Sequence, residues 1–470
     1  MDERSELDAE IEQLRAAAAA AGPGNRGERL NDLGDALRRR YVETRNLADI
    51  NDAVVALTDA ATLDRGFAVG LSIVLSDRYE RLGGDDNDLA AAIGAAELAA
   101  DANVDTDTRS LAMAALGVHL SDRYDRTGDV ADLERALELL AKAADGVDES
   151  SAEGLRWSDN LAMLRLERFE RLGDPADLDL AVLTAEATVS RAAQSLERSP
   201  EFAGFLINLG NAYRLRFEEG LATADPEKGV PVGDLLLAVE SYRRSVALLP
   251  HTSVYRAKAL TNLGSALIDR AMFLAGLEDD LGEAVTTLRE AVDLTMPGSP
   301  DRAGRLNNLA AAFSARYDRD CDPADLDRGV EAYRAAMAAG LDGNLELAAT
   351  AGANWGAWAG RRGAWPEAAR AYDGALLALD RLLRAQLLDD YRRAWLRRGD
   401  GFAAEAAYVR AVLGDYRAAV EALERGRALL LADALRREYS DLLALQEIAP
   451  ALAERYVEQA RGLRALELPG

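Results

Sequence analysis

The sequence is poor in several residue types on which common protein classes depend. Cysteine occurs once, at Cys321, so an internal disulfide framework is excluded. Proline occurs only 12 times in 470 residues, and aromatic residues make up only 6%. Alanine, leucine, arginine, aspartate and glutamate are abundant instead, which is the composition of a helical protein. No apolar run approaches the length needed to cross a bilayer, so a membrane-spanning protein is not expected.

Basic residues are scarce relative to acidic ones. The chain has 55 Lys and Arg against 81 Asp and Glu, which gives a formal net charge of −26. This balance argues against a nucleic-acid partner, because phosphates need a clustered basic surface, and against docking on anionic lipid. We expect the acidic excess on a solvated outer face, where it favours solubility and attracts basic partners. The first residues, 1–6, are too acidic for a signal or transit peptide, so we expect a cytoplasmic location.

A repeated pattern occupies most of the chain. An apolar residue and a small residue are followed seven positions later by an aromatic one, as in Leu209-Gly210 and Phe217. Full copies end at Tyr41, Tyr124, Phe169, Phe217 and Tyr317, and looser copies end at Tyr79, Ala271 and Gly363. Successive copies lie 38 to 54 residues apart, and most separations are close to 45.

A second pattern follows each of these eight copies and occurs once more, at Ala419. Small residues seven positions apart flank a central residue, as in Ala136, Leu140 and Ala143. The small residues let neighbouring helix backbones approach, and the central residue fills the gap. Copies begin at Ala53, Ala92, Ala136, Ala181, Ala238, Ala284, Gly329, Ala368 and Ala419. The two patterns predict nine helical hairpins, which must stack because one hairpin cannot bury its apolar face alone.

The connector between the two helices is long and also repeats. Residues 168–178 read Arg-Phe-Glu-Arg-Leu-Gly-Asp-Pro-Ala-Asp-Leu. We interpret this stretch as two further turns of the first helix, a C-cap at Gly173 and an N-cap at Asp174 for the second helix. Gly399-Asp400-Gly401 predicts a break between the eighth hairpin, residues 345–384, and the ninth.

These patterns resemble tetratricopeptide (TPR) repeats with a long period. The connector, and the segment from Ala422 to Leu431, resemble the TPR arrays of actinobacterial and fungal proteins that carry a CHAT domain, a caspase-like cysteine peptidase module. The resemblance covers residues 26 to about 460. It implies an all-α fold, a right-handed TPR superhelical solenoid of about nine hairpins with capping helices at both ends.

The expected organisation has four parts. They are an N-terminal capping helix and Gly-Pro linker (1–25), eight TPR-like hairpins (26–384), a ninth hairpin (385–432) and a C-terminal amphipathic segment (433–470). A final helix is expected over roughly 449–466. A CHAT peptidase needs a His and a Cys on an α/β fold, and this sequence stops where that fold would begin.

Catalysis by this chain is not expected. His119, His251 and Cys321 lie within or between helical repeats, and Asp320 and Asp322 would raise the pKa of the thiol between them. Residues 22–27 formally match a dinucleotide-binding loop, but they follow a helix and contain Pro23. No Walker loop, zinc-ligand motif or nucleophile elbow occurs, so we expect no cofactor and no metal.

An asparagine recurs just before the apolar-small pair. The series is Asp32, Asn160, Asn208, Asn262, Asn308 and Asn354. Stacked repeats would bring these side chains into a ladder. Each then bonds the backbone of the adjacent repeat, as buried amides require, or the ladder forms a polar track for an extended peptide.

The family resemblance places the first helices on the concave face of the array. The residues expected nearest a peptide groove are Asn31, Asp35, Arg38, Asn211, Arg214, Asn307, Asn308, Asn354 and Arg361. Asn and Arg suit the gripping of peptide backbone and carboxylates. Four of the five tryptophans, Trp355, Trp358, Trp365 and Trp395, lie close together in sequence. They either pack in the core or form a binding hot spot.

The function expected from the sequence is protein binding without catalysis. The resemblance makes the chain the sensor or regulatory region of a caspase-like peptidase system, with a peptide or protein in the groove and a peptidase domain in cis or in trans. The alternatives are a stand-alone scaffold of a signalling complex, with the C-terminal segment as a docking helix, and an enzyme that uses the superhelical channel.

Overall fold

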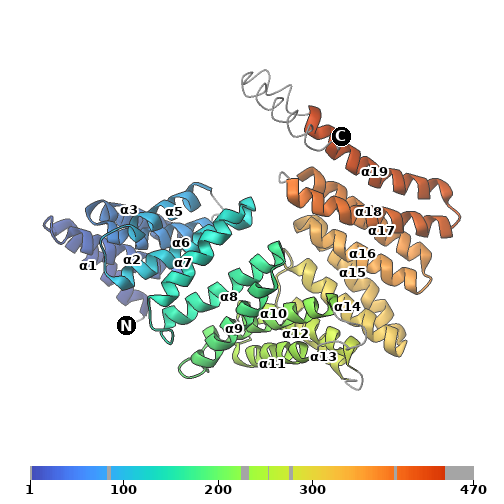
Figure 1. Ribbon diagram of the computed structural model, residues 1–470, viewed down its shortest axis with the longest axis horizontal. Coiled ribbons are helices and arrows are strands. Elements are labelled where there is room, and N and C mark those ends of the chain that lie inside the picture. Colours follow the sequence, from blue (N-terminus) through green and yellow to red (C-terminus); the bar gives the residue numbers. More distant parts are fainter. Residues whose placement is uncertain are drawn as a thin grey trace. The chain divides into compact units, whose positions relative to one another are not determined.

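The computed structural model describes residues 3–81, 86–223, 232–251, 253–274, 279–385 and 389–439. These residues form nineteen α-helices and one short 3-10 turn, and no strand occurs among them. The chain divides into two compact units, residues 1–266 and 267–470. Within each unit, helices that are consecutive in sequence pack side by side (Figure 1).

The first unit begins with a single helix, which is followed by antiparallel pairs. Its elements are α1 (Glu3–Ala20), α2 (Arg26–Thr44), α3 (Leu47–Leu63), the 3-10 turn η1 (Arg65–Phe67), α4 (Ala68–Arg81), α5 (Asp86–Ala100), α6 (Thr106–Thr127), α7 (Val130–Asp145), α8 (Ala152–Leu172), α9 (Pro175–Ala192), α10 (Pro200–Ala222) and α11 (Gly233–Leu248). The division between the units falls inside α12 (Val254–Phe273).

The second unit continues the same alternation. Its helices are α13 (Asp280–Asp293), α14 (Arg302–Asp320), α15 (Pro323–Gly343), α16 (Leu345–Arg361), α17 (Trp365–Ala385), α18 (Asp389–Val412) and α19 (Tyr416–Tyr439). The pairs from α2/α3 to α18/α19 make nine hairpins in the described residues, which confirms the number predicted from the two sequence patterns. α19 continues past residue 432, where the expected ninth hairpin ended.

The long connectors have the predicted local structure. Gly128 and Gly173 end α6 and α8 in the left-handed conformation, with φ of 69° and 74°. The next residue caps the following helix, since Asp129 accepts a hydrogen bond from the backbone N–H of Ala131. Arg45 and Cys321 occupy the same left-handed position in copies that have no glycine there. Local sequence therefore sets where each first helix ends and the second begins.

The small and large residues of the two patterns meet inside each hairpin. A Cβ added at Gly210 would lie 2.5 Å from Cε1 of Tyr242, and one added at Gly34 would lie 2.4 Å from Cγ of Leu57. α2 and α10 therefore need glycine at this point, because in these hairpins the second helix projects a large side chain onto the backbone of the first.

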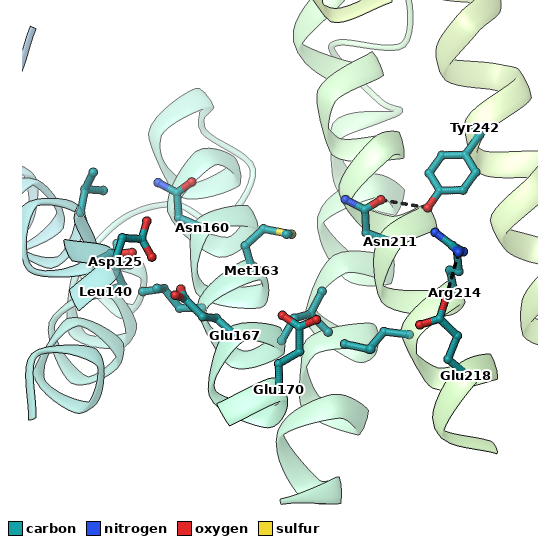
Figure 2. A pocket seen from close by; sticks show the side chains of 15 residues that line it. Asp125, Leu140, Asn160, Met163, Glu167, Glu170, Asn211, Arg214, Glu218 and Tyr242 are labelled. Carbon is teal, nitrogen blue, oxygen red and sulfur yellow. Dashed lines mark hydrogen bonds and ion pairs between the residues drawn. The ribbon is translucent and has the colours of Figure 1, made fainter. Parts of the chain in front are cut away.

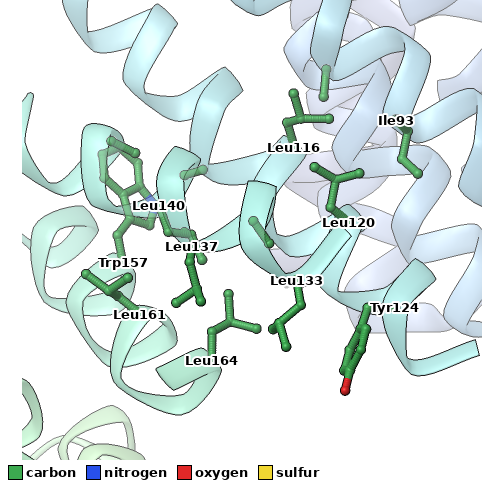
Figure 3. Packing of buried hydrophobic residues seen from close by; sticks show 14 of the residues in the cluster. Ile93, Leu116, Leu120, Tyr124, Leu133, Leu137, Leu140, Trp157, Leu161 and Leu164 are labelled. Carbon is green, nitrogen blue, oxygen red and sulfur yellow. The ribbon is translucent and has the colours of Figure 1, made fainter. Parts of the chain in front are cut away.

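Each hairpin also packs on the next one. Figure 3 shows Leu137 and Leu140 of α7 beside Trp157 and Leu161 of α8, within one buried cluster. At the start of the array, Leu7 and Ile11 of α1 are buried against the first hairpin, as the predicted N-terminal cap requires. The predicted helix at 449–466 lies outside the described residues.

The predicted break at Gly399-Asp400-Gly401 is wrong. α18 runs without interruption from Asp389 to Val412. A glycine inside a helix costs about 1 kcal/mol relative to alanine. In α18 the buried Ala403, Ala406 and Val409 pack against α17, and this burial outweighs the cost.

Candidate functional site

An arginine–aspartate pair closes seven hairpins among the described residues. In each pair, an arginine of the first helix donates two hydrogen bonds to an aspartate in the first turn of the second helix. The pairs are Arg40–Asp49, Arg78–Asp88, Arg123–Asp132, Arg168–Asp177, Arg216–Asp234, Arg270–Asp280 and Arg316–Asp325. The arginine always precedes the aromatic position of the repeat, and the aspartate usually precedes a leucine.

This pairing explains why the connector contains two aspartates. Asp174 caps α9 from outside the helix, whereas Asp177, one turn further on, is buried and receives the guanidinium of Arg168. The hydrogen bonds to the aspartate raise the pKa of Arg168, so the arginine remains charged. In the eighth hairpin, Arg362 bonds Glu367 at 2.6 Å instead. The pairs are therefore structural, and the sequence interpretation of the connector missed them.

Three asparagines of the predicted ladder bond across neighbouring repeats, but their partners lie outside the series. Asn208 of α10 donates to Asp159 of α8 at 2.7 Å, and Asn262 of α12 donates to Asn211 of α10 at 2.9 Å. In the second unit, Asn354 of α16 donates to Asn307 of α14 at 3.1 Å. The partners are side chains of the preceding first helix rather than backbone groups, because a first helix keeps its own backbone bonded. For these three asparagines, the expectation of bonds to the adjacent backbone is wrong.

Asp159, which accepts the hydrogen bond from Asn208, has an unusual environment for a carboxylate. Burial raises its pKa to about 6, although the hydrogen bond from Asn208 opposes the shift. Its second oxygen, Oδ1, is buried and has no hydrogen-bond partner among the described residues. An unpaired buried oxygen of this kind is costly to the folded state.

A groove of about 600 Å³ runs across the first helices of three consecutive hairpins in the first unit. We call it the α6–α8–α10 groove. Its lining includes Asp125 of α6, Asn160, Glu167 and Glu170 of α8, Asn211, Arg214 and Glu218 of α10, and Tyr242 of α11. Figure 2 shows Asp125 and Glu167 on one side and Arg214 and Glu218 on the other. Four carboxylates thus face a groove whose lining contains one guanidinium, so the acidic excess is not confined to a solvated outer face.

Two carboxyl groups of this groove have raised pKa values. Burial, together with the hydrogen bond and charge of Asp125, raises the pKa of Glu167 to about 8. Burial and the nearby Glu218 also raise the pKa of Glu170. Arg214 forms an ion pair with Glu218 at 3.1 Å. A cation placed in the groove would relieve repulsion among the carboxylates, since opposite charge favours their ionised forms.

Asn211 anchors one wall of the groove. Its side-chain oxygen accepts hydrogen bonds from the hydroxyl of Tyr242 at 2.8 Å and from Asn262 at 2.9 Å. Both acceptor sites of the amide oxygen are thus used inside the protein.

A second groove, of about 910 Å³, lies in the second unit. It is lined by α16 and α18, with Trp365 and Tyr372 from α17, and we call it the α16–α18 groove. Asn354 and Arg361 line it, and Arg361 contacts Asp318 at 3.5 Å.

The residues expected near a peptide groove are therefore not gathered into one site. Asn211 and Arg214 line the first groove, and Asn354 and Arg361 line the second. The remaining residues have structural contacts within their own repeats or with the next. Asn31 donates to Asp35 at 3.5 Å, Arg38 to Asp77 at 2.5 Å, and Asn307 to Asn308 at 3.4 Å. Sequence reasoning missed Asp125, Glu167 and Glu170, because their approach depends on the stacking of hairpins.

The candidate catalytic residues lie in structural positions. His119 is buried in α6, and burial lowers its pKa to about 4. Cys321 is exposed at the C-cap of α14. Among the described residues, no group of three or more His, Cys, Asp or Glu is arranged to hold a metal ion. Within the same residues, every helix is too short or too polar to be a membrane span.

The tryptophans divide into two kinds. Trp355 and Trp358 are buried, and their indole N–H groups donate to Glu367 at 2.6 Å and to Asp318 at 2.9 Å. Trp365 is half-buried and lies 6.2 Å from the ring of Tyr408, measured between centroids. The side chain of Trp395 lies outside the described residues. Core packing thus accounts for two members of the cluster, and Trp365 faces a groove.

Comparison with known proteins does not show a family for this chain. No protein-family model matches the chain, and no curated protein matches its sequence. Among solved structures, it is similar to the TPR-like repeats of a Podosopora anserina putative kinesin light chain, with 19% identity over 46% of this chain and 92% of that chain, at a TM-score of 0.33.

Two further structures are of the same kind. Human IFIT1, solved as a dimer with m7Gppp-AAAA, is 14% identical over 91% of this chain and 77% of that chain, with a TM-score of 0.44. The MamA protein is 20% identical over 49% of this chain and 97% of that chain, with a TM-score of 0.31. With the sequential packing of its hairpins, the chain is an all-α, TPR-like solenoid.

Proposed function

We propose that this protein is a non-catalytic scaffold that binds an extended segment of another protein in the α6–α8–α10 groove. The observation that carries the proposal is that three consecutive first helices line one groove of about 600 Å³. A row of parallel helices presents side chains at regular intervals, which suits an extended chain better than a compact small molecule.

The lining favours a ligand with basic side chains. Asp125, Glu167, Glu170 and Glu218 outnumber Arg214, and the ion pair of Arg214 already uses Glu218. An arginine or lysine of the ligand would pair with Glu167 and Glu170 and would displace the proton that Glu167 holds near neutral pH. The net charge of −26 would also speed the approach of a basic partner.

Titration with a labelled peptide tests this proposal. The probe is a 12-residue Gly/Ser peptide with arginine at every third position, followed by fluorescence anisotropy. The double variant Glu167→Gln/Glu170→Gln should weaken binding about tenfold, as expected for the loss of charged contacts at the centre of an interface. The matched control is Glu134→Gln/Glu138→Gln on α7, which replaces two exposed carboxyl groups outside the groove in the same way.

The pH dependence adds a second readout. Because a bound cation favours ionised Glu167, wild-type affinity should rise between about pH 6 and pH 9, while the Glu167→Gln/Glu170→Gln variant should show a flatter profile. Equal losses in the groove variant and the α7 control would mean that binding reflects net charge only, and the proposal would then be abandoned.

The wider role we propose is regulatory, as the sensor region of a CHAT-type peptidase system, with a stand-alone scaffold as the alternative. The support for the peptidase link is the connector and the resemblance of residues 422–431. The intact mass of the protein in its source cells separates the two roles. A mass well above 50.5 kDa would support a peptidase domain in cis, and a mass of 50.5 kDa would remove the cis arrangement.

A further inference from the structure

The α16–α18 groove differs from the first groove in both shape and chemistry. Its lining includes small residues of α16, Gly356, Ala357 and Gly360. Its walls are aromatic, with Trp365 from α17 and Phe402 and Tyr408 from α18. Tyr408 is 59% exposed, although large aromatic side chains normally gain from burial. The groove therefore offers apolar aromatic surfaces beside small side chains.

The hydrogen-bond donors of these aromatic residues are unused. The indole N–H of Trp365 and the hydroxyls of Tyr372 and Tyr408 have no acceptor among the described residues. By contrast, the neighbouring Trp355 and Trp358 both donate to carboxylates.

The repeat pattern explains why the Tyr372 hydroxyl is unpaired. Its counterpart in an earlier hairpin is Tyr242. The hydroxyl of Tyr242 donates to Asn211, the residue that follows Gly210 in α10. In α16 the corresponding residue after Gly356 is Ala357, which has no acceptor. Burial, followed by the charge of Glu405, raises the pKa of Tyr372 to about 12, so its hydroxyl remains a donor. The groove thus has three donors that point to a ligand rich in acceptors.

Two charged groups complete the lining. Glu405 of α18 is exposed, and the side chain of Arg361 is 64% exposed despite its contact with Asp318. Both act on the hydroxyl of Tyr372, because the charge of Glu405 raises its pKa and that of Arg361 lowers it. The carboxylate and the guanidinium therefore lie near the same point of the groove.

We propose that the α16–α18 groove binds a proline-rich segment of a partner protein in the polyproline II conformation, with a basic residue beside Glu405. A polyproline II chain exposes carbonyl acceptors and, at each proline, has no N–H that needs an acceptor in the groove. Proline rings pack flat on aromatic side chains, and the preformed helix loses little entropy on binding. A helical ligand would keep its carbonyls bonded internally and would leave the three donors unsatisfied.

The site is independent of the proposed function of the first groove, because all its residues lie within 350–409. The ligand proposed for this groove also differs from that of the first groove, because its apolar rings and carbonyl acceptors contribute more to binding than its charge does. A protein with both grooves would recognise two different features of its partners.

The test uses a fluorescein-labelled peptide of eight prolines followed by two arginines, titrated with the full chain. Tyr408→Ala should weaken binding about tenfold, because truncation of an aromatic hot spot typically has an effect of this size. The control is Tyr416→Ala on α19, which removes a tyrosine that is 72% exposed and outside the groove. It should change affinity less than about twofold.

Two further measurements separate the parts of the proposal. Glu405→Gln should weaken binding of this peptide and should not affect a peptide of ten prolines without arginine. A peptide in which alternate prolines are alanine should bind more weakly than the proline peptide, because it loses both rings and preorganisation.

The proposal is overturned if the proline peptide does not bind saturably, or if Tyr408→Ala and Tyr416→Ala bind it equally well. Better binding of a helical peptide of the same charge would also overturn it. The double variant Glu167→Gln/Glu170→Gln should leave proline-peptide binding unchanged. Failure of the first groove to bind the arginine peptide would not alter these results, so the two proposals are tested separately.

Discussion

Arg270 donates two hydrogen bonds to Asp280, at 2.7 and 2.6 Å, and both side chains are buried. Only 10% of the Arg270 side chain and 6% of the Asp280 side chain are exposed. The pair joins α12 to α13, and it lies next to Ala271, where most other repeats have an aromatic residue. A planar guanidinium matches the two oxygens of a carboxylate, which a lysine at this position would not do.

Breaking this pair should cost far more than breaking an exposed one. Asp280→Ala leaves a buried arginine unpaired and should lower the free energy of unfolding by about 3–5 kcal/mol. Replacing both partners, as in Arg270→Met/Asp280→Leu, should restore most of that loss, because no buried charge remains. Urea unfolding followed by circular dichroism measures both effects.

The matched control is Arg417→Met, which breaks an exposed pair with Glu421. The Arg417 side chain is 91% exposed, so the cost should be below about 1 kcal/mol. If Asp280→Ala were no worse than Arg417→Met, the buried pairs would not be what closes these hairpins.

Two glycines of α10 should respond in opposite ways to alanine. Gly210→Ala would bring a Cβ to 2.5 Å from the Tyr242 ring, which the hydrogen bond to Asn211 holds in place. This overpacking should cost about 1–3 kcal/mol. Gly204→Ala meets nothing within 4 Å and should stabilise the helix by about 0.5–1 kcal/mol.

The midpoint of urea unfolding distinguishes the two variants. A loss of stability in both would mean that α10 does not tolerate any side chain at either point, in conflict with the packing. The pair of variants keeps the chemical change constant, so only the surroundings of the added methyl group differ.

The raised pKa of Glu167 predicts a pH-dependent contribution to stability. The folded protein holds this proton up to about pH 8, well above the ordinary glutamate pKa of about 4.3. Because the native state binds the proton more tightly than the unfolded chain, this contribution to stability is present below about pH 4.3 and is lost as the pH rises to about 8.

Glu167→Gln should therefore raise the melting temperature at high pH and leave it almost unchanged at low pH. After allowance for the partial exposure of Glu167, the gain at pH 9 should be about 1 kcal/mol, or about 2 °C. Differential scanning fluorimetry at pH 4.5 and pH 9 measures it. The same shift at both pH values would show that ionisation of Glu167 is not the cause.

Cys321 takes the left-handed position in which other repeats have glycine. Its φ is 56°, against 69° for Gly128. Since a side chain is unfavourable in this conformation, Cys321→Gly should stabilise the protein by about 0.5–1 kcal/mol. Cys321→Ala keeps the side-chain penalty and should have no comparable effect. Urea midpoints that rise equally for both variants would attribute the gain to loss of the thiol instead.

The sequence by itself determined the local structure and the repeat. Gly128 and Asp129 act through their own backbone and their nearest neighbours, so their roles as caps follow from residue type and position. The nine hairpins follow from the recurrence of small and large residues, as Gly210 and Tyr242 illustrate. The arginine–aspartate pairs also leave a regular signal in the sequence. That signal does not say which of the two aspartates of a connector turns inward.

Only the tertiary structure decided which side chains of different hairpins meet. Asp125 and Glu167 are 42 residues apart, and the angle at which α6 and α8 stack brings both into one groove. The sequence predicted that asparagines of neighbouring repeats would approach, but their hydrogen-bond partners, such as Asp159 for Asn208, depend on the rotation of each first helix against the next. Small changes in many packed contacts set that rotation, and no single residue encodes it. The chemistry of both grooves follows from this stacking.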